Sequence, residues 1–348
     1  MPQTTARTHQ HVATLTTRRA LRRCALRRSA GVAVASGEGP LSTAIDLRSR
    51  LQQTDLARRR QGGTAGWQEV EGSWVRSPPG RAWGVVHFTG GAVLGSYPHL
   101  CYDALLSSLS DSSGLMVVAT PYELGTDHDA ISRESQRKLK ATLSAVCVRD
   151  DLDVNMPLFS LGHSLGAKLQ LLQACRGGAH RAAVLLAFNN ASATDSVRVL
   201  EQFARAFLQD GRAAGRGVSD AVLGAMPFIS AMAERAASAA GLNFTPGPPE
   251  TLQRATAEYT VRRCLVVAFD NDTLHHSDGL VQALQSRRDT IEMLKRPGNH
   301  LTPVVLTLTP PDELAQMTGS RLPQTVGDEA GARQLGVDIA QWFTRAAM

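Results

Sequence analysis

The feature that most constrains this sequence is a regular alternation of short apolar runs with longer segments of helical periodicity. Most apolar runs lack polar alternation, as in strands that are covered on both faces of a parallel sheet. We therefore predict an α/β fold with one mostly parallel, doubly wound sheet and helices on both faces. The expected strands are 82–88, 115–121, 157–163, 182–188, 264–270 and 290–296, and the expected helices are 98–109, 131–146, 165–175 and 332–346.

Two segments depart from this alternation. Residues 67–80 carry Trp67, Val70 and Trp74 before two prolines, which predicts an opening pair of strands. Residues 191–260 are too long for a simple crossover. We interpret them as a helical cap inserted over the carboxyl edge of the sheet. Additional helical packing explains their apolar stripe equally well, and that stripe consists of Val197, Leu200, Phe203 and Phe207.

The first 40 residues have a different composition from the rest of the chain. They are rich in Arg, Thr, Ser and Ala and contain no acidic residue before Glu38, which is typical of an organelle transit peptide. The alternative is a disordered basic tail. Composition does not separate a chloroplast address from a mitochondrial one. We expect a polar linker at 41–66 and the folded domain at 67–348.

Charge and cysteine placement exclude several function classes. Residues 1–40 hold seven of the 37 basic residues and one of the 31 acidic residues, so the remaining chain carries 30 of each. A neutral body gives no general attraction to nucleic acid. The five cysteines lack metal-ligand or redox spacing, and no dinucleotide fingerprint or phosphate loop occurs. We expect no cofactor, no metal and no membrane span, which leaves peripheral membrane contact open.

A candidate nucleophile lies between two predicted elements. Residues 158–168 read LFSLGHSLGAK, which places Ser164 between Gly162 and Gly166 where a strand runs directly into a helix. This corner is the setting of the nucleophile elbow, in which small flanking residues allow a tight turn. Ser164 is therefore predicted to be a nucleophile that needs a base and an acid from later in the chain.

The chain supplies both partners in the order serine, acid, histidine. Asp270 and Asp272 follow the predicted strand 264–270, and His300 lies in a loop after the next strand. His300 is predicted to take the Ser164 proton, and a carboxylate would fix its tautomer. We choose Asp272 over Asp270 because it lies further from the strand end, with Asp195 as the fallback.

An oxyanion formed at this serine needs two backbone N–H donors. The amide of Leu165, directly after the nucleophile, is the expected first donor. The second should come from the loop HFTGGAVLG, in which Thr89 or Gly90 is the expected residue. The alternative reading of this loop is a glycine turn without a catalytic role.

Four other residues lie near these motifs. We assign His163, Asn189 and His128 as possible substrate-pocket residues, although Asn189 is also a common turn residue and His128 a common helix cap. Lys168, one turn past Ser164, is expected at the surface or in helix packing. Adjacent His275 and His276 do not make a metal site, because neighbouring residues rarely bind one ion together.

Seven segments together resemble the DUF1350 family of plants, algae and cyanobacteria, within the α/β-hydrolase superfamily. They cover roughly residues 67–306 and read HFTGGAVLG, VVATPYELGTDH, GHSLGAKL, AFNN, NFTPGPPET, FDNDTLHH and PGNHLTP. The resemblance implies an α/β-hydrolase fold and, for a eukaryotic member with this leader, a plastid location. It implies no particular substrate.

We therefore expect a serine hydrolase, esterase-like or lipase-like, that forms an acyl-enzyme with a small-molecule acyl or lipid-like ester. Thioesters and amides are less favoured substrates. An acyltransferase would use the same residues with an alcohol in place of water. A non-catalytic scaffold that binds a plastid lipid, pigment or protein is the alternative from another class. In a catalytic site, His300 should contact Ser164 within about 3.5 Å and a carboxylate through its other nitrogen.

Overall fold

The structure is a computed structural model that describes residues 40–60, 64, 66–153, 155–193, 195–196, 243–285, 290–308 and 324–348. The expected transit peptide at 1–40 lies outside these residues apart from Pro40 and stays a prediction. The apolar stripe of the expected cap, from Val197 to Phe207, also lies outside them.

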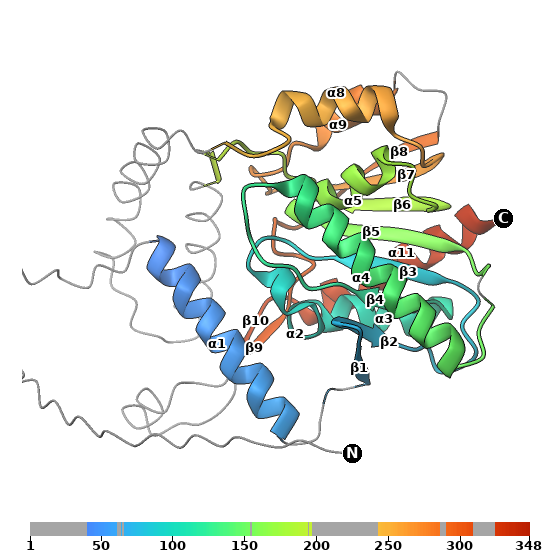
Figure 1. Ribbon diagram of the computed structural model, residues 1–348. Coiled ribbons are helices and arrows are strands. Elements are labelled where there is room, and N and C mark those ends of the chain that lie inside the picture. Colours follow the sequence, from blue (N-terminus) through green and yellow to red (C-terminus); the bar gives the residue numbers. More distant parts are fainter. Residues whose placement is uncertain are drawn as a thin grey trace, which may run out of the picture. The chain divides into compact units, whose positions relative to one another are not determined.

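An eight-stranded sheet forms the centre of the described fold (Figure 1), in the order β1-β2-β4-β3-β5-β6-β7-β8. β1 pairs antiparallel with β2, and β2 pairs antiparallel with β4. Every other pair in this sheet is parallel, which confirms the predicted mostly parallel sheet. The strands are β1 (Trp67–Val70), β2 (Ser73–Arg76), β3 (Val85–Thr89), β4 (Met116–Ala119), β5 (Leu158–His163), β6 (Ala182–Leu186), β7 (Arg263–Phe269) and β8 (Thr290–Arg296), and a separate pair joins β9 (Leu306–Leu308) to β10 (Gln324–Val326).

Helices cover both faces of the sheet (Figure 1). One layer contains α3 and α11, and the other contains α4, α5, α8 and α9. None of the helices in the described ranges is long and apolar enough to cross a membrane. The helices are α1 (Pro40–Arg60), α2 (Pro98–Cys101), α3 (Asp103–Ser113), α4 (His128–Arg149), α5 (Leu165–Cys175), α8 (Pro248–Glu258), α9 (Ser277–Gln285) and α11 (Glu329–Ala347), with a 3₁₀ turn η1 (Leu94–Ser96).

The apolar strands fill two cores because successive side chains point to opposite faces of a sheet. In β3, Val86 and Phe88 pack into the cluster that includes α3 and α11, whereas Val85 packs with Leu139 of α4. In β6 and β7 the alternate side chains pack with α5, α8 and α9. The continuous apolar runs are therefore explained by burial on both faces.

Helix α1 corrects the prediction of a linker at 41–66. Leu47 and Leu51, one turn apart, are buried in the core cluster with α3 and α11. Asp55, a further turn along, accepts a 2.8 Å hydrogen bond from His99, whose ring stacks on Trp74 at 3.5 Å between centroids. Two buried leucines one turn apart are too weak a pattern to predict this helix, because the contacts that order it come from distant residues.

Helix α8 corrects the far boundary of the expected cap. The structure describes only the two ends of the predicted insertion at 191–260. At the second end, α8 packs against α5 and α9, with Ala255 and Tyr259 buried in their shared cluster. Residues 248–260 therefore belong to the layer that covers the sheet. The short polar helix gives little sign of this in the sequence because few of its side chains are buried.

Five histidines are buried within the described fold. Burial lowers the pKa of His99 and His180 to about 4 and of His128 and His163 to about 3, and it holds the pKa of His87 well below its usual value. An unfolded chain protonates these side chains near pH 6.5, whereas the folded chain protonates them only at lower pH. At pH values between the folded and unfolded pKa values, the unfolded state thus binds more protons than the folded state.

We therefore predict that the free energy of unfolding falls as pH decreases from about 6.5 towards 4. Each histidine contributes a slope of up to about 1.4 kcal/mol per pH unit. Urea unfolding of the protein between pH 7 and pH 5 measures this dependence. His180→Leu should make the dependence shallower, because both ring nitrogens of His180 are buried without a hydrogen-bond partner. An identical pH dependence in this variant would contradict the assignment.

Candidate active site

Ser164 lies at the sharp corner between β5 and α5. Its backbone has φ 56° and ψ −120°, a left-handed conformation that is uncommon for a residue with a Cβ. The Ser164 amide donates to the carbonyl oxygen of Leu186 in β6 at 2.9 Å, which ties the corner to the neighbouring strand. The sequence therefore folds here into the strained strand-to-helix turn that presents a nucleophile.

The two flanking glycines are required by close backbone packing. A Cβ at Gly162 would lie 2.6 Å from the Ala167 Cα atom. A Cβ at Gly166 would overlap the carbonyl oxygens of Thr89 and Gly90 at the end of β3. The glycines thus let α5 begin directly against the end of β3, which brings Ser164 beside the loop that follows that strand.

Ser164, His300 and Asp272 are joined by two hydrogen bonds. The Nε2 atom of His300 lies 2.8 Å from Ser164 Oγ, and its Nδ1 atom lies 2.8 Å from Asp272 Oδ2. These residues come from the end of β5, the loop after β7 and the loop after β8. The carboxyl ends of parallel strands meet at one edge of a sheet, which brings the three loops together.

The local contacts of Asp272 keep its carboxylate in place. Its side chain is fully buried, and Oδ1 accepts a 2.8 Å hydrogen bond from the Leu274 amide. Burial alone would raise the pKa of Asp272, but the hydrogen bond and charge of His300 lower it below the usual value. Asp270 is exposed, and Asp195 is exposed and bonded to Ser192, so the structure places neither against His300.

His163 does not offer a free nitrogen to a ligand. Its Nε2 lies 2.9 Å from the His300 carbonyl oxygen, which can only accept, so Nε2 carries the proton. Nδ1 then accepts from the Tyr102 hydroxyl at 2.9 Å, and the Tyr102 oxygen accepts from the Gly91 amide at 2.8 Å. One chain of hydrogen bonds thus connects the loop after β3 to the backbone of His300.

The loop after β3 places different residues at the nucleophile from those expected. Thr89 donates its hydroxyl to the Gly166 carbonyl at 2.9 Å, and the Gly90 carbonyl accepts from Tyr122 at 2.9 Å. Both residues are buried, and neither is part of the cavity wall. Gly91 and Ala92 form that wall beside Ser164 instead.

Two backbone amides remain as candidate oxyanion donors. Leu165 begins α5, so its N–H has no acceptor within the helix and borders the cavity. The Gly91 amide already donates to Tyr102, which leaves the Ala92 amide as the second candidate. Of the donors predicted from the sequence, Leu165 lines the cavity, whereas Thr89 and Gly90 do not. Their assignment as oxyanion donors stays a prediction.

A cavity of about 480 Å³ opens beside Ser164. Asn189 and His128, both expected near the site, lie in its wall. Asn189 donates to the Leu274 carbonyl at 2.8 Å, which links the loop after β6 to the loop that carries Asp272. Lys168 also lies in the wall and is fully buried, so the expectation of a surface or packing lysine missed its position. Apolar residues dominate the wall, among them Val93, Leu94, Leu124, Ala191, Phe244 and Leu301.

The described residues contain no group of three or more His, Cys, Asp or Glu side chains that could hold a metal ion. Burial raises the pKa of Cys101 and Cys264. A raised pKa keeps these thiols protonated and unreactive at neutral pH. Ser164 is therefore the candidate nucleophile of the described site, and its hydroxyl lies 2.8 Å from His300 Nε2.

Solved structures of esterases share this arrangement of strands and helices. An esterase from the archaeon Pyrobaculum calidifontis has a TM-score of 0.51 and 16% identity over 87% of this chain and 94% of its own. A monoclinic form of the Pyrobaculum calidifontis esterase has a TM-score of 0.50 and 15% identity over 87% of this chain and 93% of its own. A thermostable esterase from Pseudomonas putida has a TM-score of 0.48 and 16% identity over 86% of this chain and 89% of its own. At these identities the two Pyrobaculum calidifontis structures establish the fold alone.

Sequence comparison assigns the family separately from the structure. No curated protein matches the sequence. Residues 66–311 match the family described as "Protein of unknown function (DUF1350)", which agrees with the resemblance seen in the seven sequence segments. The chain belongs to the DUF1350 family and has the α/β-hydrolase fold.

Proposed function

We propose that this protein is a serine hydrolase that cleaves a carboxylic ester through an acyl-enzyme on Ser164. The observation that carries the proposal is the pair of 2.8 Å hydrogen bonds on His300, one to Ser164 Oγ and one to Asp272 Oδ2. A non-catalytic scaffold has no need for a buried carboxylate, a histidine and a strained serine in this geometry. The esterases of similar fold support the same reaction class.

In the first half-reaction, Ser164 Oγ attacks the ester carbonyl carbon while His300 Nε2 takes the hydroxyl proton. The carbonyl π electrons move to oxygen, where the Leu165 and Ala92 amides would stabilise the negative charge. Asp272 stays ionised and stabilises the imidazolium. The oxyanion then collapses, the ester C–O bond breaks, and the alcohol leaves with the proton from His300.

In the second half-reaction, water takes the place of the alcohol. His300 accepts a proton from this water as its oxygen attacks the acyl carbon, and a second oxyanion forms at the same amides. Collapse of this intermediate breaks the bond to Ser164 Oγ, which recovers its proton from His300. The products are a carboxylic acid and an alcohol, and the steps need no cofactor.

The cavity wall supports a hydrophobic acyl group. Val93 and Leu94 come from the loop after β3, Leu124 from the loop after β4, and Leu301 follows His300. Contact with such a wall removes apolar ligand surface from water, which contributes roughly 25 cal/mol per Å² of that surface. The volume of about 480 Å³ is within the range of small-molecule sites.

We predict that a fluorophosphonate probe labels the wild-type protein and that Ser164→Ala and His300→Ala abolish the labelling. Asp272→Asn should slow it roughly 10²- to 10⁴-fold, because His300 loses the carboxylate that fixes its tautomer. Asp270→Asn is the matched control, since Asp270 lies two residues away and is exposed. In-gel fluorescence over time gives each rate constant. A folded wild-type protein that takes up no probe would contradict the proposal.

We also predict that Tyr102→Phe slows labelling more than Tyr122→Phe does. Both changes remove a buried hydroxyl that is bonded to the loop after β3, and each should destabilise the fold by about 1–3 kcal/mol. Of the two, only the Tyr102 hydroxyl is connected to the backbone of His300, through its hydrogen bond to His163. Thermal unfolding of both variants controls for stability, and equal labelling rates would show that the connection does not position His300.

A further inference from the structure

Lys168 differs in charge from the apolar residues that line the same cavity. Lys168 lies one turn after Ser164 in α5, about 6 Å along the helix axis. Its side chain is fully buried and forms part of the cavity wall. Among the described residues of that wall, Arg48 is the other lysine or arginine. Arg48 is half-exposed and pairs with Glu123 at 2.6 Å, so Lys168 is the buried charge.

Two loop segments surround Lys168. The Lys168 Nζ atom donates to the Pro246 carbonyl oxygen at 2.9 Å. The Thr245 amide donates to the Thr126 carbonyl at 2.9 Å, which joins the segment before α8 to the segment before α4. His128, the first residue of α4, packs its ring on Phe244 at 4.3 Å between centroids. These segments close the cavity beside Lys168.

The cavity wall also contains an unused hydrogen-bonding atom. The Nδ1 atom of His128 is buried and has no hydrogen-bond partner. The His128 side chain is 3% exposed and belongs to the cavity wall. The Lys168 ammonium has three N–H donors, of which Pro246 takes one. Two N–H groups of Lys168 and the Nδ1 atom of His128 thus have no hydrogen-bond partner among the described residues.

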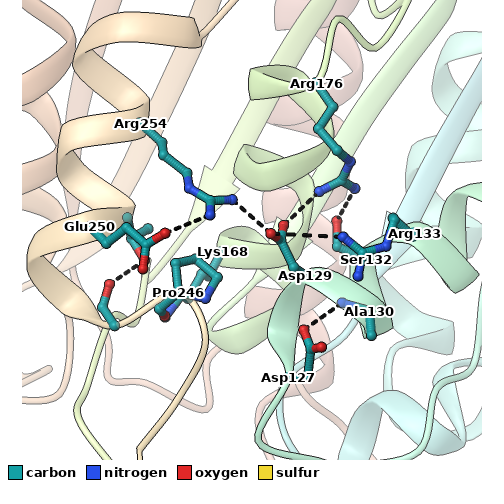
Figure 2. Close-up of polar contacts among 12 residues, drawn as sticks. Asp127, Asp129, Ala130, Ser132, Arg133, Lys168, Arg176, Pro246, Glu250 and Arg254 are labelled. Atoms are coloured by element: carbon teal, nitrogen blue, oxygen red, sulfur yellow. Dashed lines mark hydrogen bonds and ion pairs between the residues drawn. The ribbon is translucent and has the colours of Figure 1, made fainter.

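The carboxylates near Lys168 are bound by other cations (Figure 2). Asp129 lies 2.9 Å from Arg176, 2.7 Å from Arg254 and 3.8 Å from Arg133. Glu250 pairs with Arg254 at 2.5 Å. Within the described part of the chain, no ion pair involves Lys168. The nearby carboxylates influence its charge at a distance, and they do not form a contact that would neutralise it.

A purely structural role does not explain this charge. A neutral donor could satisfy the Pro246 carbonyl without the free-energy cost of burying an ammonium. Burial lowers the pKa of Lys168 to about 8, so the ammonium remains the main form at pH 7. A carboxylate of a ligand would form a charge-assisted hydrogen bond with that ammonium and offset the cost of its burial.

We propose that the cavity binds an ester that carries a carboxylate, with Lys168 holding the carboxylate and Ser164 facing the ester. This inference rests on the proposed function, because it names the substrate class of the same site. The apolar residues of the wall would contact a hydrocarbon chain. An amphiphilic ester, which carries both an acid group and a hydrocarbon chain, matches a cavity lined by one buried ammonium and apolar side chains.

The test uses two matched pairs of ligands on the full chain carrying Ser164→Ala, which prevents turnover. Monomethyl suberate is compared with dimethyl suberate, and 8-acetoxyoctanoate with its methyl ester. The first pair places the carboxylate on the acyl side and the second places it on the alcohol side. Isothermal titration calorimetry at pH 7 measures the affinities. We expect the acid of at least one pair to bind at least tenfold more tightly than its neutral partner.

Lys168→Met, added to Ser164→Ala, should bring that affinity ratio close to one, and Lys168→Arg should retain part of it. Lys138→Met is the matched control. Lys138 also donates to a proline carbonyl, that of Pro121 at 2.8 Å, but lies outside the cavity wall. Its loss should leave the ratio unchanged. Circular dichroism verifies that each variant is folded.

Equal affinities within both pairs in Ser164→Ala alone would overturn the inference, whatever the lysine variants do. A ratio that survives Lys168→Met would also overturn it. Failure of the proposed function gives a different result. In that case the wild-type protein takes up no fluorophosphonate and hydrolyses neither acidic nor neutral esters, whereas the preference for the acid in the binding experiment persists and still supports the role of Lys168.

Discussion

The backbone turn at Ser164 is the constraint on which the rest of the site depends. A positive φ at this residue ends β5 and starts α5 without an intervening loop. The turn is possible because Gly162 allows the start of α5 to lie against β5 and Gly166 allows it to lie against the end of β3. The same close approach brings Gly91 and Ala92 to the nucleophile. Nucleophile, candidate oxyanion donors and cavity wall therefore all follow from one strained corner.

Neutral buried histidines extend this organisation away from the nucleophile. His163 can bridge Tyr102 and the His300 carbonyl because burial keeps its ring uncharged, with one nitrogen donating and the other accepting. A protonated ring would have no acceptor for the Tyr102 hydroxyl. The positions of the loops after β3 and β8 thus depend on one tautomer. This dependence couples the acid stability of the fold to the geometry of His300.

The fold and the proximity of Ser164, Asp272 and His300 could be predicted because they follow from local patterns. Apolar runs that are buried on both faces identify the parallel strands, and their carboxyl ends bring Ser164, Asp272 and His300 to one edge. A family resemblance over most of the chain pointed to the same fold. Apolar periodicity and chain order thus account for the predicted part of the site.

The remaining features depend on contacts between distant residues. Tyr102 reaches His163 across 61 positions, and α1 is ordered by a core to which it supplies Leu47 and Leu51. The path of the loop after β3 places Ala92 in the cavity wall and leaves Thr89 and Gly90 out of it, and composition does not encode this path. The burial of Lys168 also depends on distant residues, because a lysine is expected in solvent unless tertiary structure buries it. These features depend on tertiary contacts that local sequence patterns do not reveal.

Trapping the acyl group on the protein tests the central claim most directly. The wild-type protein is mixed with an activated ester, quenched in acid after a few milliseconds to seconds, and analysed by intact mass and peptide mapping. We predict a mass increase of one acyl group on the peptide that contains Ser164, and no such increase in Ser164→Ala. Ester hydrolysis in which Ser164 never carries the acyl group, or an adduct that persists in Ser164→Ala, would contradict the account.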